Sequence, residues 1–263
     1  MSTERLHNTD SKTQIIAVTG KGGVGKTSLA GVIVKLLVRA CPGKRILAID
    51  ADPAVGLSTV LNVDVDMTID DIRKRVIGSV ENGDTKSAVE LLSEAKYDIY
   101  DAIAEKDGYA FIAIGRPESA GCYCRINSYL KEVITMLSDQ FDYVVIDGEA
   151  GIEQVNRRVM EKVTHLLLVT DASKKGCQVV GTIKKVADEL VMYEKTGVII
   201  NRVPDKDVVK HMDLGGLDVL SVIESDSRLA QCDIMGGNVL ELPDDSLIVK
   251  GAEEALKNIG IIE

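Results

Sequence analysis

A glycine-rich loop close to the N-terminus carries the residue types that bind phosphate. Residues 20–27 read GKGGVGKT and match the pattern G-x-x-x-x-G-K-[ST]. In this pattern the backbone N–H groups surround the phosphates, the final lysine reaches the β- and γ-phosphates, and the hydroxyl binds Mg²⁺. We therefore predict a nucleotide site formed by Gly20, Lys21, Gly22, Gly23, Val24, Gly25, Lys26, Thr27 and Ser28.

Acidic residues stand at the ends of two apolar segments in which we expect strands. Asp50 and Asp52 follow the first segment, and Asp147 ends the second. Doubly wound folds bind ligands at the carboxyl ends of their strands, so these carboxylates should lie near the phosphates. There a carboxylate can belong to the Mg²⁺ shell or orient a water for in-line attack. The alternative for Asp50 and Asp52 is that they only cap a helix.

Asn201 ends a further expected strand and is followed by Arg202. An asparagine side chain has a donor and an acceptor, so it can read the edge of an adenine base. We place both residues among the candidate nucleotide-binding residues. Taken alone, an asparagine at this position is more typical of a turn.

Cys122 and Cys124 form a C-x-C pair in an expected loop after residues 109–114. Two thiolates supply half of a tetrahedral site for a soft metal, and a two-fold dimer would bring four together. The alternative is that they are ordinary loop thiols. The remaining cysteines lack a motif and are expected to be buried packing residues, namely Cys41, Cys177 and Cys232.

Alternating strands and helices must position these residues. Continuously apolar runs are typical of strands buried on both faces of a parallel sheet, and they span 14–19, 45–50, 109–114, 142–147, 165–170, 197–201 and 217–223. Helices are expected over 27–40, 68–80, 86–106, 127–139, 152–162, 179–194 and 244–258. This order predicts an α/β P-loop NTPase fold, with one doubly wound, mostly parallel sheet of about seven or eight strands flanked by helices. We expect a mobile tail over 1–13 and a single domain over 14–263.

The composition argues against several classes of partner. The chain has 263 residues, and 41 acidic against 31 basic side chains give a net charge of −10. Nucleic acids and anionic membranes are bound by basic surfaces, so we expect neither partner. We find neither the apolar core of a signal peptide nor a run of about 18 apolar residues that could span a membrane. The expected location is the cytoplasm.

With these residues assigned, the sequence resembles the MinD/ParA/nitrogenase-iron-protein class of ATPases. The early lysine of the loop, Lys21, is typical of that class, and the resemblance implies that it crosses a dimer interface to the partner's nucleotide. The alternative is a solvated surface lysine. The resemblance further implies that Asp52 positions the attacking water, while Asp50 and Asp147 belong to the Mg²⁺ shell beside Thr27.

A narrower resemblance comes from the middle of the chain. Residues 117–124 read P-x-x-x-G-C-x-C and residues 147–153 read DGEAGIE, and with the loop they are similar to the CooC/AcsF group of nickel-handling ATPases. This resemblance implies a homodimer that hydrolyses ATP to ADP and phosphate and binds Ni²⁺, or Zn²⁺ in vitro, through both C-x-C pairs. The implied client is carbon monoxide dehydrogenase or acetyl-CoA synthase. Glu149 receives no role.

Two other functions stay open. A MinD- or ParA-like positioning ATPase should carry a basic amphipathic helix at its C-terminus or a basic DNA-binding face, whereas residues 253–263 include acids and the net charge is negative. An iron–sulfur carrier or reductase related to the nitrogenase iron protein would share the fold. Those proteins hold their cluster with cysteines at other spacings.

Overall fold

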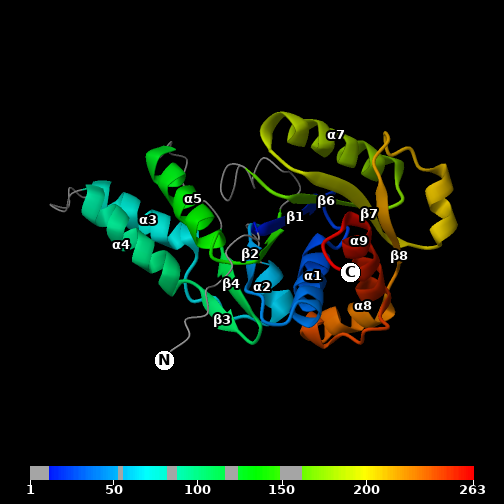
Figure 1. Ribbon diagram of the computed structural model, residues 1–263, viewed down its shortest axis with the longest axis horizontal. Helices are drawn as coiled ribbons and strands as arrows, with labels where there is room; N and C mark the ends of the chain where they lie inside the picture. Colours follow the sequence, from blue (N-terminus) through cyan, green and yellow to red (C-terminus); the bar gives the residue numbers. More distant parts are fainter. Residues whose placement is uncertain (1–11, 53–55, 82–87, 116–123, 149–161) are drawn as a thin grey trace, which may run out of the picture.

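An eight-stranded sheet runs through the centre of the molecule (Figure 1). The computed structural model describes residues 12–52, 56–81, 88–115, 124–148 and 162–263. The strands lie in the order β3-β4-β2-β5-β1-β6-β7-β8, and all neighbours are parallel except β3 and β4. The strands are β1 Gln14–Gly20, β2 Ile46–Asp50, β3 Ala104–Lys106, β4 Tyr109–Ala113, β5 Tyr143–Asp147, β6 His165–Thr170, β7 Lys195–Val203 and β8 Val219–Glu224.

The predicted fold class is confirmed, because every apolar run identified in the sequence contributes a strand to this sheet. The expected helix over 86–106 is wrong at its end: α4 stops at Asp101, and β3 then pairs antiparallel with β4. Asp107 and Gly108 form the two-residue connection, and Gly108 has a φ of +87°. An Asp-Gly pair is a strong signal for such a tight hairpin, and here it prevails over the helical periodicity.

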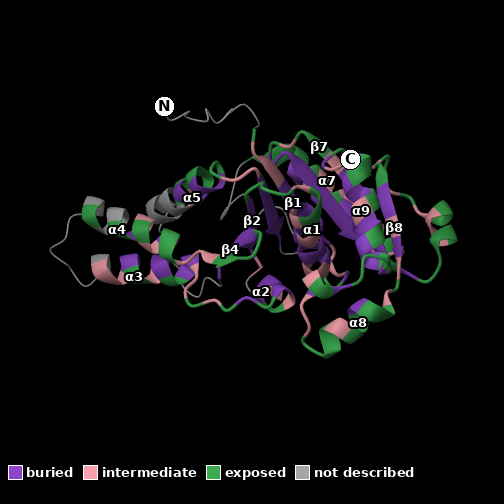
Figure 2. Ribbon diagram, turned by 60° about the horizontal axis from the view of Figure 1, so that its bottom comes forward, coloured by how far each residue is buried: buried purple, intermediate pink, exposed green. Residues whose placement is uncertain are grey.

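Helices cover both faces of the sheet, and the apolar core lies in two layers between helices and strands (Figure 2). One layer is formed with α1 Lys26–Ala40, α2 Gly56–Leu61, α8 Ser227–Ile234 and α9 Leu247–Ile259. The other is formed with α3 Ile69–Glu81, α4 Ala88–Asp101, α5 Cys124–Ser138 and α7 Lys174–Leu190. Two short 3-10 helices, η1 Lys206–His211 and η2 Val239–Glu241, complete the described elements.

The predicted helices correspond to these elements with shifted ends. α7 begins at Lys174 rather than at residue 179, because Ser173 caps it by accepting a hydrogen bond from the Gly176 N–H. The expected helix over 152–162 lies outside the described residues except for its last position. In the described part of the chain, no helix combines the length and the apolar character that crossing a bilayer requires.

Asp226 ties the starts of two helices together. One carboxylate oxygen accepts the N–H groups of Arg228 and Leu229 in α8, at 2.9 and 3.2 Å. The other accepts the Ser246 hydroxyl at 2.6 Å and the Ile248 N–H at 3.0 Å, at the start of α9. A single carboxylate therefore satisfies donors that two helix N-termini would otherwise leave unpaired.

We expect Asp226→Ala to lower the free energy of unfolding by about 3 kcal/mol, because it removes caps from both helices. Urea denaturation followed by circular dichroism measures this loss. Asp205→Ala is the matched control: Asp205 caps only η1, accepting one N–H from Asp207. An equal loss in the two variants would contradict the double-cap assignment.

Candidate nucleotide-binding site

The phosphate loop joins β1 to α1 at the carboxyl edge of the sheet (Figure 1). Gly23 and Gly25 have φ angles of +77° and +89°, a backbone conformation that favours glycine. Gly25 is the N-cap of α1; it provides no side-chain cap, and the first turn holds no acidic residue. The N–H groups and positive dipole end of α1 can therefore receive an anion.

The loop encloses a cavity of about 440 Å³. Lys26 lines it; this side chain is 8% exposed, and its Nζ donates a 3.2 Å hydrogen bond to the Lys21 carbonyl. The remaining lining residues are Gly22, Gly23, Gly25, Thr27, Asp52 and Arg202. Residues predicted from three separate parts of the sequence thus meet at one place.

Asp50 is fully buried at the end of β2 and holds the start of α2. Its carboxylate accepts N–H groups from Leu57 at 2.8 Å and from Asp52 at 3.2 Å. The capping role considered for Asp50 is therefore present in this structure. Burial raises the pKa of Asp50 to about 6, although the backbone hydrogen bonds lower it in part.

Asp147 stands directly opposite Asp50 in the register of β2 and β5 and is 1% exposed. Burial raises the pKa of Asp147 to about 7, while the nearby Thr27 hydroxyl and Lys26 ammonium lower it in part. Neither carboxylate oxygen has a hydrogen bond of normal geometry to another described residue. Hard carboxylate and hydroxyl oxygens beside a phosphate loop suit hydrated Mg²⁺, so the residues present fit that ion.

Lys21, which is expected to act across a dimer interface, is held within its own chain. Its ammonium forms an ion pair with Asp171 and lies 3.2 Å from the Ser173 hydroxyl. Burial alone would raise the pKa of Asp171, but hydrogen bonds from Lys21 and Ser173 lower it overall. Sequence reasoning missed Asp171, although it directly follows an apolar run, which is the same signal that identified Asp50 and Asp147.

Asn201 and Arg202 reach the phosphate loop from the end of β7. Asn201 is 2% exposed, and its Nδ2 donates to the Val24 carbonyl at 2.8 Å. Arg202 donates from Nη1 to the Gly23 carbonyl at 3.0 Å, from a backbone with φ of +57°. The two side chains therefore hold the backbone of the phosphate loop by hydrogen bonds to its carbonyl groups, a role that the sequence did not indicate. The adenine contact of Asn201 stays a prediction.

We expect Asn201→Ala to weaken the binding of ATP and of inorganic tripolyphosphate alike, by about tenfold, because a loosened loop affects the phosphates. Isothermal titration calorimetry with both ligands measures the change. Asn258→Ala is the control: Asn258 lies in α9, and the substitution removes a similar side-chain amide bond, to the Leu220 carbonyl in β8. A loss confined to ATP would instead favour adenine recognition by Asn201.

The cysteines divide into the C-x-C pair and three single residues. Of the pair, Cys122 lies outside the described residues, as does Glu149, and Cys124 is the first residue of α5. Cys41, Cys177 and Cys232 are free thiols and half-buried rather than buried as expected. The expected packing role is confirmed for Cys41 and Cys232, which pack against the apolar core. Within the described ranges, no group of three or more histidine, cysteine, aspartate or glutamate side chains could hold a metal ion.

Residues 15–239 match the model of the CobQ/CobB/MinD/ParA nucleotide binding domain. The chain belongs to this family of P-loop ATPases, which confirms the broader of the resemblances seen in the sequence. An uncharacterized ATP-binding protein of Methanocaldococcus jannaschii, MJ0685, is 34% identical over 249 residues, covering 93% of this chain and 98% of that protein.

Two further similarities bear on function. The carbon monoxide dehydrogenase accessory protein CooC of Rhodospirillum rubrum is 27% identical over 237 residues, covering 86% of this chain and 89% of that protein. The crystal structure of the cell division ATPase MinD of Pyrococcus furiosus superposes with a TM-score of 0.65 at 22% identity, covering 94% and 98% of the two chains. The second similarity supports the fold alone.

Proposed function

We propose that this protein is a cytoplasmic ATPase that binds nickel through Cys122 and Cys124 at a dimer interface. It would assist nickel insertion into carbon monoxide dehydrogenase or acetyl-CoA synthase. The observation that carries the proposal is the position of the end of β4 beside the nucleotide site. The Ile114 N–H, at the end of β4, donates to the Asp50 carbonyl at 2.8 Å. The chain therefore leaves the sheet at Ile114 beside Asp50, eight residues before Cys122 in the sequence. The similarity to CooC supports the same reading.

In the proposed reaction, water attacks the γ-phosphorus of ATP, the bond to the ADP oxygen breaks, and inorganic phosphate leaves. Lys26 and the N–H groups at the start of α1 bind the phosphate charge. Asp52 orients the water. Thr27, Asp50 and Asp147 would hold Mg²⁺ and its waters, and the ion supplies charge neutralisation on the β- and γ-phosphates.

Lys21 would join two chains when ATP is bound. In the single chain its ammonium is already paired with Asp171, so the dimer must exchange that contact for the partner's phosphates. We expect Lys21→Ala to bind ADP but to lose dimerisation with a nonhydrolysable ATP analogue. Asp171→Asn should dimerise at a lower analogue concentration, because it no longer competes for Lys21. Sedimentation velocity measures both, and a Lys21→Ala dimer like that of wild type would contradict this role.

Metal stoichiometry tests the proposal most directly. Anaerobic equilibrium dialysis should give one Ni²⁺ per dimer, with protons released as the thiols ionise. Cys122→Ser or Cys124→Ser should abolish binding while ATP affinity stays unchanged. The double variant Cys41→Ser/Cys232→Ser is the control and should bind normally. One Ni²⁺ per monomer, or binding by the C-x-C variants, would contradict the bridging site. Anaerobic pull-down of the client then identifies which enzyme receives the metal.

A MinD-like positioning ATPase is the second candidate, favoured by the match to a family model that includes MinD and ParA. α9 does not supply a membrane-binding face in this structure, because its apolar side chains lie in the core, namely Ile248, Val249, Ala252, Leu256 and Ile259. That helix cannot insert into a membrane without leaving its place. ATP-dependent sedimentation with anionic liposomes would support this candidate, and its absence together with nickel binding supports the first.

A further inference from the structure

A second cavity lies at the edge of the sheet opposite the phosphate loop. Its volume is about 560 Å³, which is within the usual range for small-molecule sites. Its walls come from four places: the connection between α1 and β2, the β3–β4 hairpin, and the segments that follow α4 and α5. None of its lining residues belongs to the nucleotide site.

Aromatic side chains gather at this cavity. The chain has seven tyrosines, two phenylalanines and no tryptophan, and three of these nine aromatic residues line the cavity: Tyr100, Tyr109 and Phe141. Gln140 fixes Tyr100 by donating from Nε2 to its hydroxyl at 2.9 Å. Tyr109 is 6% exposed, and its hydroxyl forms no hydrogen bond with another described residue. Flat apolar walls with a spare hydroxyl suit a planar ligand that carries a polar group.

The rim of the cavity is basic although the protein is acidic. Lys44, Arg45 and Lys106 line it against a single acid, Glu105. Lys44 is neutralised by Asp142 at 3.0 Å. Arg45 is 67% exposed and shares the same carboxylate through a longer ion pair, with its Nε 3.9 Å away. Lys106 lines the cavity and has no ion pair with another described residue. Counting Glu105 and Asp142 against the three cations, the rim keeps a net positive charge of about one, with Arg45 and Lys106 the groups that can turn toward an incoming anion.

We propose that this cavity binds a planar aromatic anion, with its ring against Tyr100, Tyr109 and Phe141 and its acidic group at Arg45 and Lys106. A helix C-terminus carries a negative dipole end, and α1, α4 and α5 all end near the cavity. Part of the basic charge offsets those dipoles, so affinity requires the aromatic contact as well as the charge.

The site is separate from the phosphate loop. α1 begins at the loop and its C-terminal end reaches this cavity, where Val38 and Cys41 line the wall. Fifteen helical residues span about 20 Å, so the two ligands do not compete for space. The proposal does not depend on metal binding.

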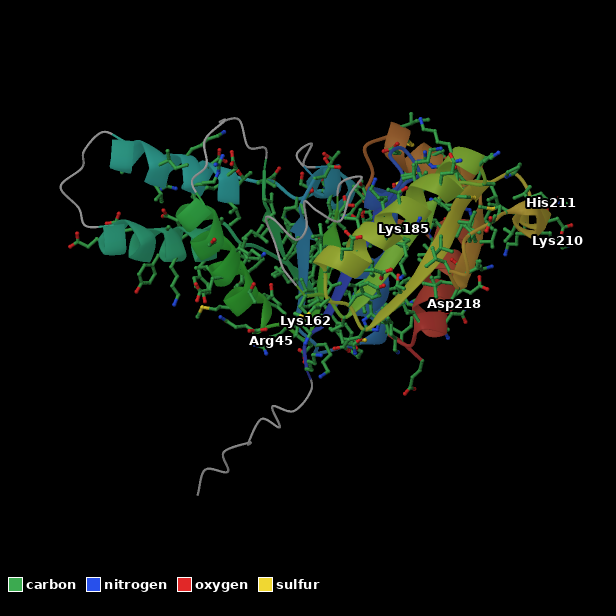
Figure 3. All side chains as sticks on the ribbon, turned by 90° about the horizontal axis from the view of Figure 1, so that it is seen from above. Arg45, Lys162, Lys185, Lys210, His211 and Asp218 are labelled. Carbon is green, nitrogen blue, oxygen red and sulfur yellow. The ribbon has the colours of Figure 1, made fainter. Side chains whose placement is uncertain are left out.

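The probe is 1-anilinonaphthalene-8-sulfonate, whose fluorescence rises in apolar surroundings, titrated into the whole protein with saturating MgATP present. We expect one saturable site. Arg45→Gln/Lys106→Gln should weaken it about tenfold, because two cations are lost. The control Lys185→Gln/Lys210→Gln removes the same charge elsewhere, on α7 and η1, and should change nothing; Figure 3 shows these two lysines well away from Arg45. The neutral analogue N-phenyl-1-naphthylamine should bind more weakly and equally to all three proteins.

The alkylation rate of Cys41, which lines the cavity, provides an independent test of probe binding that needs no mutation. The probe should slow alkylation of Cys41 by iodoacetamide, followed by peptide mass spectrometry, while Cys232 on α8 reacts at an unchanged rate. Failure of the probe to bind a saturable site while MgATP is present, equal loss in the control variant, or no protection of Cys41 would each overturn the proposal.

Discussion

Nucleotide affinity is expected to fall by at least about a hundredfold when Lys26 is replaced by methionine, because the phosphates lose their only buried cation in the loop. Lys26 is 8% exposed at the start of α1 and lines the cavity of the phosphate loop. Methionine keeps the apolar stem and removes the charge. Fluorescence titration with a labelled ATP analogue measures the loss.

Lys185→Met is the matched control for this prediction. Lys185 is exposed on α7 and has no ion pair with a described residue, so the same substitution there should leave affinity unchanged (Figure 3). Circular dichroism should show that Lys26→Met folds like wild type. Affinity within threefold of wild type in the folded Lys26→Met variant would contradict the assignment of the loop.

The sheet was predictable because its strands are buried on both faces, and such strands are continuously apolar whatever packs on them. The hairpin between β3 and β4 was not, although Asp107 and Gly108 signal it. Ala104–Lys106 is too short to show an alternation of its own, and it continues the helical pattern of α4. Whether such a short segment forms a helix or a strand is decided by its pairing with a neighbouring strand, here β4.

The candidate nucleotide site also has one part that the sequence predicts and another that it does not. The loop could be predicted because one contiguous pattern specifies both the backbone shape and the chemistry. The roles of Asp171 and Asn201 could not, since each depends on one contact across the fold, to Lys21 and to the Val24 carbonyl. Residues that act through partners 150 or more positions away leave no local spacing to read.

Asp147→Asn is expected to stabilise the nucleotide-free protein while it impairs ATP hydrolysis. Asp147 is 1% exposed and its carboxylate has no hydrogen bond of normal geometry with a described residue, so its charge is costly to bury. Asparagine has a similar shape and no charge. At pH 7.5 the gain in free energy of unfolding should be on the order of 2 kcal/mol. Asp218→Asn, at an exposed position, is the control and should give no gain.

The pH dependence of that gain identifies its cause. The pKa of Asp147 is about 7 in the folded state, above its ordinary value of 3.8. The folded state therefore keeps a proton on Asp147 that the unfolded chain releases, so the contribution of Asp147 to wild-type stability declines as the pH rises from about 4 to about 7. Burial lowers the pKa of His165 to about 4, which acts in the opposite direction but equally in both proteins. The difference between variant and wild type in urea denaturation should consequently be small near pH 4 and largest above pH 7. A gain that does not change with pH would attribute the effect to packing and not to the buried charge.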